Sequence, residues 1–367
     1  MKKYAFRGGL LIDGTGAAAV ENSLVLVDGD KITYAGADQA VPDGYEVYNI
    51  SGKTIMPGLI DAHLHFSGNL TDNDTDWPTE DNLQKAVVAV QQAHECLEAG
   101  LTTVGEVSLF GIHIRNMIEQ KVMKGPRVVA TGRGFCATCS HGDSHKVSIE
   151  RNREGHPWGE CVDSPWDLRK AVRRRLRENP DAIKIWATGG GIWRWETAMD
   201  QHYTMEEVQA VVDECKMRHV PVWSHCFGSA ANSVKAGVDL IIHGQSLDDG
   251  TLDLMAAKGI ALCPTINFMP AWLTTFPPKY DPALHDQYPG ETVAEKDLNR
   301  IYANLKKAKE RGILLTTGSD SFNSQMTPYG ETTVGELHAF VECAGISEMD
   351  TIVAATKKKK KVLRVDD

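Results

Sequence analysis

Residues 57–65 constrain the fold of this chain more than any other stretch, because a short apolar run ends there in His-x-His. The sequence reads PGLIDAHLH. The apolar run from Thr54 to Ile60 predicts a buried strand. Side chains two residues apart on a strand project from the same face, so we expect His63 and His65 to point the same way. Two neutral imidazoles placed like this can chelate one divalent cation.

Four later apolar runs each carry one polar residue of a kind that binds metals. These residues are Lys184 in AIKIW, His225 ending VWSH, His243 ending LIIH, and Asp320 ending ILLTTGSD. Each has an ordinary explanation when taken alone, such as a core histidine, a snorkelling lysine or a helix N-cap aspartate. The recurrence along one chain favours a shared metal site. We therefore predict a metal centre made of His63, His65, Lys184, His225, His243 and Asp320.

Apolar runs alternate with amphipathic stretches from Thr54 onward, which is typical of β/α units around a parallel sheet. Eight strands are expected, carrying His63 and His65, Val104, Val129 (run 127–133), Lys184, His225, His243, Leu262 and Leu315 (run 313–317). The predicted helices include 81–99, 164–178, 204–218 with a capping box, 229–236, 248–258 and 291–311. Eight such units predict an α/β fold, a (β/α)8 TIM barrel with its active site at the C-terminal ends of the strands. Lys184 lies in mid-strand and would reach that site with its long side chain.

The chain divides into three predicted parts. Residues 1–53 contain short strands and tight turns, such as the one at Asp28-Gly29, and are expected to form the N-terminal half of a small β-sandwich. Residues 54–350 would form the barrel, and residues 351–367 a C-terminal helix and tail. The basic run Lys357–Lys361 is expected to be a solvated helix end or tail.

Bulk composition narrows the function classes. The 367 residues are 42% hydrophobic and carry a formal net charge of −10, which argues against a nucleic-acid-binding surface. No apolar run is long enough to span a bilayer, and the early Arg7 argues against a signal peptide. Eight cysteines without regular spacing favour the reducing cytoplasm.

Cys136 and Cys139 form a C-x-x-C pattern that His141 and His145 follow. A small zinc ribbon and a redox pair are both alternatives here. A closed zinc site would need its own scaffold, so we favour a loop that lines the mouth of the barrel.

These motifs together resemble the binuclear-metal branch of the amidohydrolase superfamily, in particular the imidazolonepropionase-like enzymes that include Xaa-Pro and Xaa-Arg dipeptidases. The likeness covers nearly the whole chain, through MPGLIDAHLH, IKI followed by ATGG, then SH, IHG and GSD. It implies two divalent metal ions, with zinc the first expectation, although manganese, cobalt or iron would suit the same ligands.

The resemblance also assigns roles to residues. It implies that His63, His65 and Asp320 hold the more buried ion, that His225 and His243 hold the second, and that Lys184, carboxylated by CO₂, bridges both. A metal-bridged hydroxide would attack the scissile carbonyl, and Asp320 would carry the proton to the leaving amine.

Some residues depart from the family pattern. Dipeptidase-type relatives often have Tyr or His two residues after the fifth-strand histidine, where this chain has Phe227. The loop after the fourth strand, GGIWRWE, is aromatic, with Trp193 as a candidate pocket wall and Arg194 as a candidate partner for a carboxylate. The predicted substrate-binding residues are therefore His141, Trp193, Arg194 and Phe227.

The sequence stops at Asp367, before the strands with which relatives complete the sandwich. We therefore expect an incomplete small domain, either because the sandwich is reduced here or because the sequence is a truncated version of a longer protein. The function predicted is hydrolysis of a C–N amide bond in a small molecule, either a dipeptide or an N-acyl amino acid. Opening of a cyclic amide, or hydrolysis of a carbamate or urea, is the alternative within the superfamily. A deaminase is disfavoured because Gly228 stands where such enzymes usually place Glu. Two further alternatives are a barrel that lacks catalytic activity and assembly of the chain into a homo-oligomer.

Overall fold

The computed structural model describes residues 2–71, 73, 76–193, 195–268, 293–357 and 363. Its internal contacts divide the protein into two compact units. One comprises the chain up to Leu59 together with Glu348–Lys357, and the other comprises Ile60–Ser347. Each unit is described by itself.

The smaller unit is built on a four-stranded sheet in the order β4-β3-β1-β5. Its strands are β1 (Lys3–Arg7), β3 (Ser23–Asp28), β4 (Lys31–Ala37) and β5 (Glu46–Asn49), and Ala5, Leu24 and Leu26 form its buried core. The predicted turn after Asp28 is confirmed: β3 and β4 are an antiparallel hairpin, and Gly29 has the positive φ of 62° that favours glycine. Strand β2 (Leu10–Leu11) pairs with β6 (Thr54–Ile55), and helix α12 (Glu348–Thr356) belongs to this unit.

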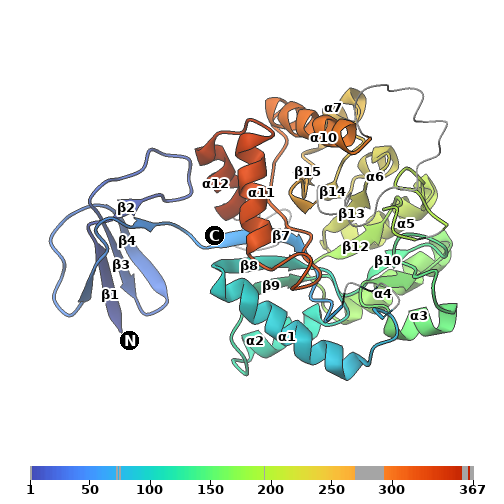
Figure 1. Ribbon diagram of the computed structural model, residues 1–367, viewed down its shortest axis with the longest axis horizontal. Coiled ribbons are helices and arrows are strands. Elements are labelled where there is room, and N and C mark those ends of the chain that lie inside the picture. Colours follow the sequence, from blue (N-terminus) through green and yellow to red (C-terminus); the bar gives the residue numbers. More distant parts are fainter. Residues whose placement is uncertain are drawn as a thin grey trace. The chain divides into compact units, whose positions relative to one another are not determined.

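The larger unit is the predicted (β/α)8 barrel, with its strands in the middle and helices around them (Figure 1). One run of parallel strands has the order β7-β8-β9, and another has the order β11-β10-β12-β13-β14-β15. The strands are β7 (Leu59–Leu64), β8 (Leu101–Glu106), β9 (Arg127–Ala130), β10 (Gly134–Cys136), β11 (Gly159–Cys161), β12 (Ile183–Trp186), β13 (Val222–Cys226), β14 (Leu240–His243) and β15 (Ala261–Cys263).

Helices surround these strands, and most of them begin and end close to the predicted positions. They are α1 (Asn82–Glu98), α2 (Gly111–Glu119), α3 (Ile149–Gly155), α4 (Pro165–Arg177), α5 (Met205–Lys216), α6 (Ala231–Ala236), α7 (Asp249–Lys258), α10 (Val293–Glu310) and α11 (Glu331–Glu342). The predicted capping box at the start of α5 is confirmed, since Thr204 accepts from the Glu207 amide and Glu207 accepts in return. Helices α2, α3 and α11 were not predicted. None of the helices in the described residues is long and apolar enough to cross a bilayer.

The prediction of one strand over 54–60 is wrong. Residues 54–55 pair within the smaller unit, and a new strand, β7, begins at Leu59. Pro57 lies between the two strands and has no N–H to donate to a sheet, which accounts for the break. His63 is therefore inside β7, whereas His65 follows its last residue.

The predicted strands at 127–133 and 313–317 also differ. The first is divided into β9, which pairs with β8, and β10, which pairs with β12, and Gly132 between them has a φ of 69°. The second is an extended segment with a single bridge at Leu315, because it divides its hydrogen bonds between two neighbours. Leu314 and Thr316 bond to Leu262 of β15, and the Thr317 carbonyl accepts from Ala62 of β7. This segment links β15 to β7.

Candidate metal centre and pocket

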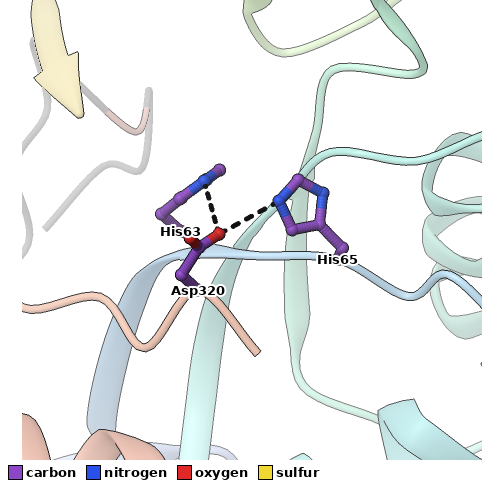
Figure 2. A group of neighbouring side chains, drawn as sticks. All are labelled: His63, His65 and Asp320. Atoms are coloured by element: carbon purple, nitrogen blue, oxygen red, sulfur yellow. Dashed lines mark hydrogen bonds and ion pairs between the residues drawn. The ribbon is translucent and has the colours of Figure 1, made fainter. Parts of the chain in front are cut away.

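Two imidazoles and one carboxylate meet at the end of the barrel. The Nε2 atoms of His63 and His65 lie 3.1 and 3.2 Å from the same oxygen, Oδ1 of Asp320, as Figure 2 shows. These three buried residues are the group in the described part of the chain whose His, Cys or carboxylate atoms come close enough to hold one metal ion. They come from the first barrel strand and from the segment after the eighth, which are adjacent in space.

The carboxylate of Asp61 fixes the distance between these two segments. It accepts hydrogen bonds from the backbone amides of His63 and Ser319 and from the hydroxyl of Thr333. Asp61 is fully buried, and burial raises its pKa to about 6. The backbone also joins the two segments directly, through the Asp320 amide and the His63 carbonyl at 2.8 Å.

His225 and His243 form a second pair beside the first group. Their ring centroids lie 4.6 Å apart, and the ring of His243 lies 5.7 Å from that of His63. Nε2 of His243 is 4.0 Å from Oδ2 of Asp320. The two histidines therefore extend the first group across the barrel.

Neighbouring oxygens hold one ring nitrogen of each of three histidines. His65 Nδ1 contacts the Val107 carbonyl at 2.6 Å, and His225 Nε2 contacts the Gly189 carbonyl at 3.1 Å. His243 Nδ1 contacts the Thr265 hydroxyl at 2.6 Å. Such contacts orient a histidine and leave its other nitrogen for a metal.

Lys184 is buried in the middle of β12, with 1% of its surface exposed. Its Nζ has no hydrogen-bond partner within the described residues and lies 5.3 Å from the centre of the Trp186 ring. Burial lowers the pKa of Lys184 to about 7, although the nearby charge of Asp320 opposes this shift. An orphaned buried amine is costly to a fold and is a candidate for chemical modification or ligand binding.

The protonation states of this group suit metal binding. Burial lowers the pKa of His63 to about 3 and holds the pKa values of His225 and His243 well below their ordinary range, so all three are neutral imidazoles. Burial alone would raise the pKa of Asp320, but the hydrogen bonds from His63 and His65 outweigh it and hold that pKa well below its usual value. Neutral imidazoles and a carboxylate fit a divalent metal centre, and the lowered pKa of Lys184 makes the neutral amine available near pH 7. We call the six residues the polar cluster: His63, His65, Lys184, His225, His243 and Asp320.

Backbone strain gathers at the same place. His243, Asp320 and Thr265 have φ values of 70°, 55° and 48°, in the left-handed region that residues with a Cβ seldom adopt. Thr265 is the residue whose hydroxyl contacts His243. Strain of this kind persists where the surrounding structure imposes it, and it is common at functional sites.

A pocket of about 400 Å³ of empty space, including its opening to solvent, lies over the polar cluster. Apart from residues of that cluster, it is lined by what we call the pocket wall: His141, Trp158, Trp186, Ile192, Phe227, Phe268 and Phe322. Wall and cluster touch directly, since the Trp158 ring lies 5.3 Å from His65 and the Phe227 ring 4.3 Å from His243. The pocket is therefore apolar around a polar base, as ligand sites commonly are.

Two of the four predicted substrate-binding residues line the pocket. His141 and Phe227 line the pocket, and the His141 ring stacks on His225 at 4.6 Å. Trp193 does not line it. Its indole is buried behind the wall, where Nε1 donates to the His141 carbonyl at 2.7 Å. Arg194 lies outside the described residues.

Sequence reasoning missed most of the wall and one buried charge. Trp158, Trp186, Phe268 and Phe322 come from separate loops and strand ends, and no spacing relates them. Glu196 directly follows an aromatic stretch, and the sequence gives no separate signal that its carboxylate is buried. Its carboxylate is fully buried against His141.

The cysteine loop contains no compact metal site in the described residues. Cys136 is buried in β10 with its sulfur 3.8 Å from that of Cys161, whereas Cys139 is exposed. The loop nevertheless carries His141 to the pocket, as expected for a loop at the mouth of the barrel.

Known proteins match this chain over most of its length. The model of the amidohydrolase family matches residues 54–367. Ochratoxinase from Aspergillus niger is 26% identical over 376 positions, covering 95% of this chain and 74% of that protein.

Two solved structures have the same fold. The crystal structure of the A. niger ochratoxinase has a TM-score of 0.83 at 22% identity, covering 96% of this chain and 82% of that one. A Xaa-Pro dipeptidase with methionine bound in its active site has a TM-score of 0.82 at 27% identity, covering 99% of this chain and 89% of that one.

Proposed function

Because this chain belongs to the amidohydrolase family, we propose that it hydrolyses the amide bond of a dipeptide or N-acyl amino acid with two bound metal ions. The chain is a hydrolase that acts on carbon–nitrogen bonds. The proposed two-metal hydrolysis of an amide is supported by the convergence of the polar cluster beneath an apolar pocket.

His63, His65 and Asp320 would hold one ion, and His225 and His243 the other. Bound divalent ions lower the pKa of a water molecule and polarise a carbonyl, and we propose zinc because nitrogen ligands dominate the cluster. The oxygens that contact His65, His225 and His243 would keep those rings oriented.

Lys184 would supply the ligand that the two sites share. Its lowered pKa of about 7 provides a neutral amine, which is the form that reacts with CO₂. In that reaction the amine nitrogen bonds to the carbon of CO₂ and loses a proton, giving a carbamate anion. An anion would also account for an amine that has no partner within the described residues.

Asp320 would move the proton. It is ionised and lies at the centre of the cluster, so it can accept the proton of the attacking water. It would then deliver that proton to the leaving nitrogen, which is a poor leaving group unless it is protonated.

The pocket wall would select the substrate. Its aromatic rings favour a substrate with an apolar or aromatic group, and His141 would offer a polar contact beside it. The related dipeptidase structure holds methionine, an amino acid with an apolar side chain, in its active site. That likeness supports a substrate that contains an amino acid.

The test is release of free amine from a panel of N-acetyl and N-benzoyl amino acids and dipeptides, alongside elemental analysis. We expect about two metal ions per chain, loss of hydrolysis on chelation and recovery on adding zinc. Asp320→Asn should lower kcat/KM by roughly 10²- to 10⁴-fold, and Glu119→Gln, at an exposed position of α2, should not lower it. Hydrolysis that survives full metal removal would contradict the proposal. Activity restricted to cyclic amides, carbamates or ureas would move the assignment to those substrates.

A further inference from the structure

Glu196 is a buried carboxylate in the loop after β12, outside the polar cluster. Its side chain has no exposed surface, and Oε1 lies 2.9 Å from Nδ1 of His141. The backbone amides of Gly190, Ile192 and Trp193 also donate to it, at 3.0, 3.1 and 3.3 Å. A buried charge with this many donors is held in one place.

The contact with Glu196 decides which nitrogen of His141 carries the proton. An ionised carboxylate only accepts hydrogen bonds, so Nδ1 of His141 must donate. In the neutral ring Nε2 then has a free lone pair, and it makes no hydrogen bond within the described residues. His141 lines the pocket, so Nε2 is the ring nitrogen left to interact with a substrate.

The surrounding loops fix the position of this ring as well as its tautomer. The Trp193 indole donates to the His141 carbonyl at 2.7 Å, and the His141 amide donates to Nδ1 of His202 at 3.4 Å. Gly190 gives the ring its space, because a Cβ at that position would lie 1.9 Å from Cε1 of His141. Two loops from different strands thus hold one imidazole over the polar cluster.

We propose that Glu196 is a positioning residue, which holds His141 as the Nδ1–H tautomer so that Nε2 accepts a hydrogen bond from an N–H group of the substrate beside the reacting carbonyl. The role rests on the proposed function, since it requires a substrate in this pocket. The His141 ring held in this way also provides a polar contact near Phe227, whose ring lies 6.2 Å away and carries no hydroxyl.

The first test needs no substrate. In protein labelled with ¹⁵N-histidine, long-range ¹H–¹⁵N spectra report the tautomer of each ring, and His141→Ala identifies the signals of residue 141. We expect the Nδ1–H form in the native protein and a mixture of the two tautomers in Glu196→Gln. The amides of Ile192 and Trp193 keep the new side-chain oxygen beside Nδ1, but a neutral amide accepts less strongly than a carboxylate does. The Nε2–H form in the native protein, or no change in the variant, would overturn the proposal.

The second test is a double-mutant cycle on the best substrate of the panel. Glu196→Gln should lower kcat/KM by roughly 10- to 100-fold in the native background. It should lower kcat/KM less than about threefold in the His141→Ala background, because its effect acts through that ring. The metal content and the melting temperature of Glu196→Gln should match those of Glu119→Gln, the exposed control.

Equal losses in the two backgrounds would show that Glu196 only supports the loop, and would overturn the positioning role. If the native protein hydrolyses nothing in the panel, the proposed function fails, while the spectra still decide what Glu196 does to His141.

Discussion

The polar cluster and the pocket wall face the same space but are held in different ways. Backbone and hydroxyl oxygens of the barrel fix three of the cluster's histidines, at distances of 2.6 to 3.1 Å. Ring packing holds much of the wall, for example Trp158 against Trp77 at 5.0 Å and against Phe322 at 5.8 Å. The exception is His141, which a buried carboxylate holds.

This difference indicates which part of the site sets the chemistry and which part sets the substrate. Hydrogen bonds to a barrel scaffold are directional, so they specify ligand geometry closely. Aromatic packing tolerates exchange of one apolar side chain for another of similar size. We therefore expect changes in the cluster to abolish hydrolysis and changes in the wall to redistribute it among substrates.

Lys184→Ala should break the cluster most severely. Without the amine no carbamate forms, so we expect metal content to fall from about two ions per chain to one or none. The loss of transition-state stabilisation should lower kcat/KM by more than about 10²-fold. Elemental analysis and initial rates on the same preparation measure both effects.

Lys216→Ala, at the exposed end of α5, is the matched control and should keep both metals. Added acetate or formate should restore part of the metal content of Lys184→Ala by entering the space that the side chain vacates. Two metals and full activity in Lys184→Ala would show that Lys184 does not bridge them.

The same contrast explains how far the sequence predicted this molecule. The barrel and the convergence of His63, His65 and Asp320 follow from a local rule, because polar residues near the ends of parallel strands meet at one end of a barrel. The break at Pro57 has a local signal, the missing N–H of proline, which the apolar run obscured. The break at Gly132 has a non-local cause, because it depends on which strands pair with β9 and β10. Trp158 and Glu196 were missed because loop conformation brings them to the pocket, and no periodicity encodes it.

Trp158→Leu should have a moderate and selective effect. The indole lines the pocket against His65, so its removal takes away contact area that an aromatic substrate group would use. We expect kcat/KM to fall roughly tenfold for N-benzoyl substrates and less than about threefold for N-acetyl ones. Trp166→Leu, at a position 78% exposed on α4, is the matched control and should change neither.

The ratio of kcat/KM for N-benzoyl substrates to kcat/KM for N-acetyl substrates distinguishes a lost substrate contact from lost support of His65. An equal loss on N-benzoyl and N-acetyl substrates would show that Trp158 supports His65 and does not contact substrate.

Lys85 tests the stability of the residues behind the pocket wall, and among these variants we expect the smallest effect on hydrolysis there. Its Nζ is buried and donates to the carbonyls of Trp77 and Gly155 at 3.0 and 2.7 Å, and the Trp77 ring packs behind Trp158. Burial lowers the pKa of Lys85 to about 8, against the opposing charges of Glu80 and Asp81. An unfolded lysine titrates near 10.4.

Between pH 8 and about 10.4, the unfolded chain therefore binds more protons at Lys85 than the folded chain does. The free energy of unfolding of the native protein should rise with pH across this window, by on the order of 2 kcal/mol relative to Lys85→Met. Urea unfolding of metal-free protein at several pH values measures this difference, with Lys216→Met as the exposed control. Parallel curves for the native protein and Lys85→Met would mean that the amine is not desolvated in solution. The loop carrying Trp77 would then be held by ring packing, like the aromatic residues of the pocket wall in front of it.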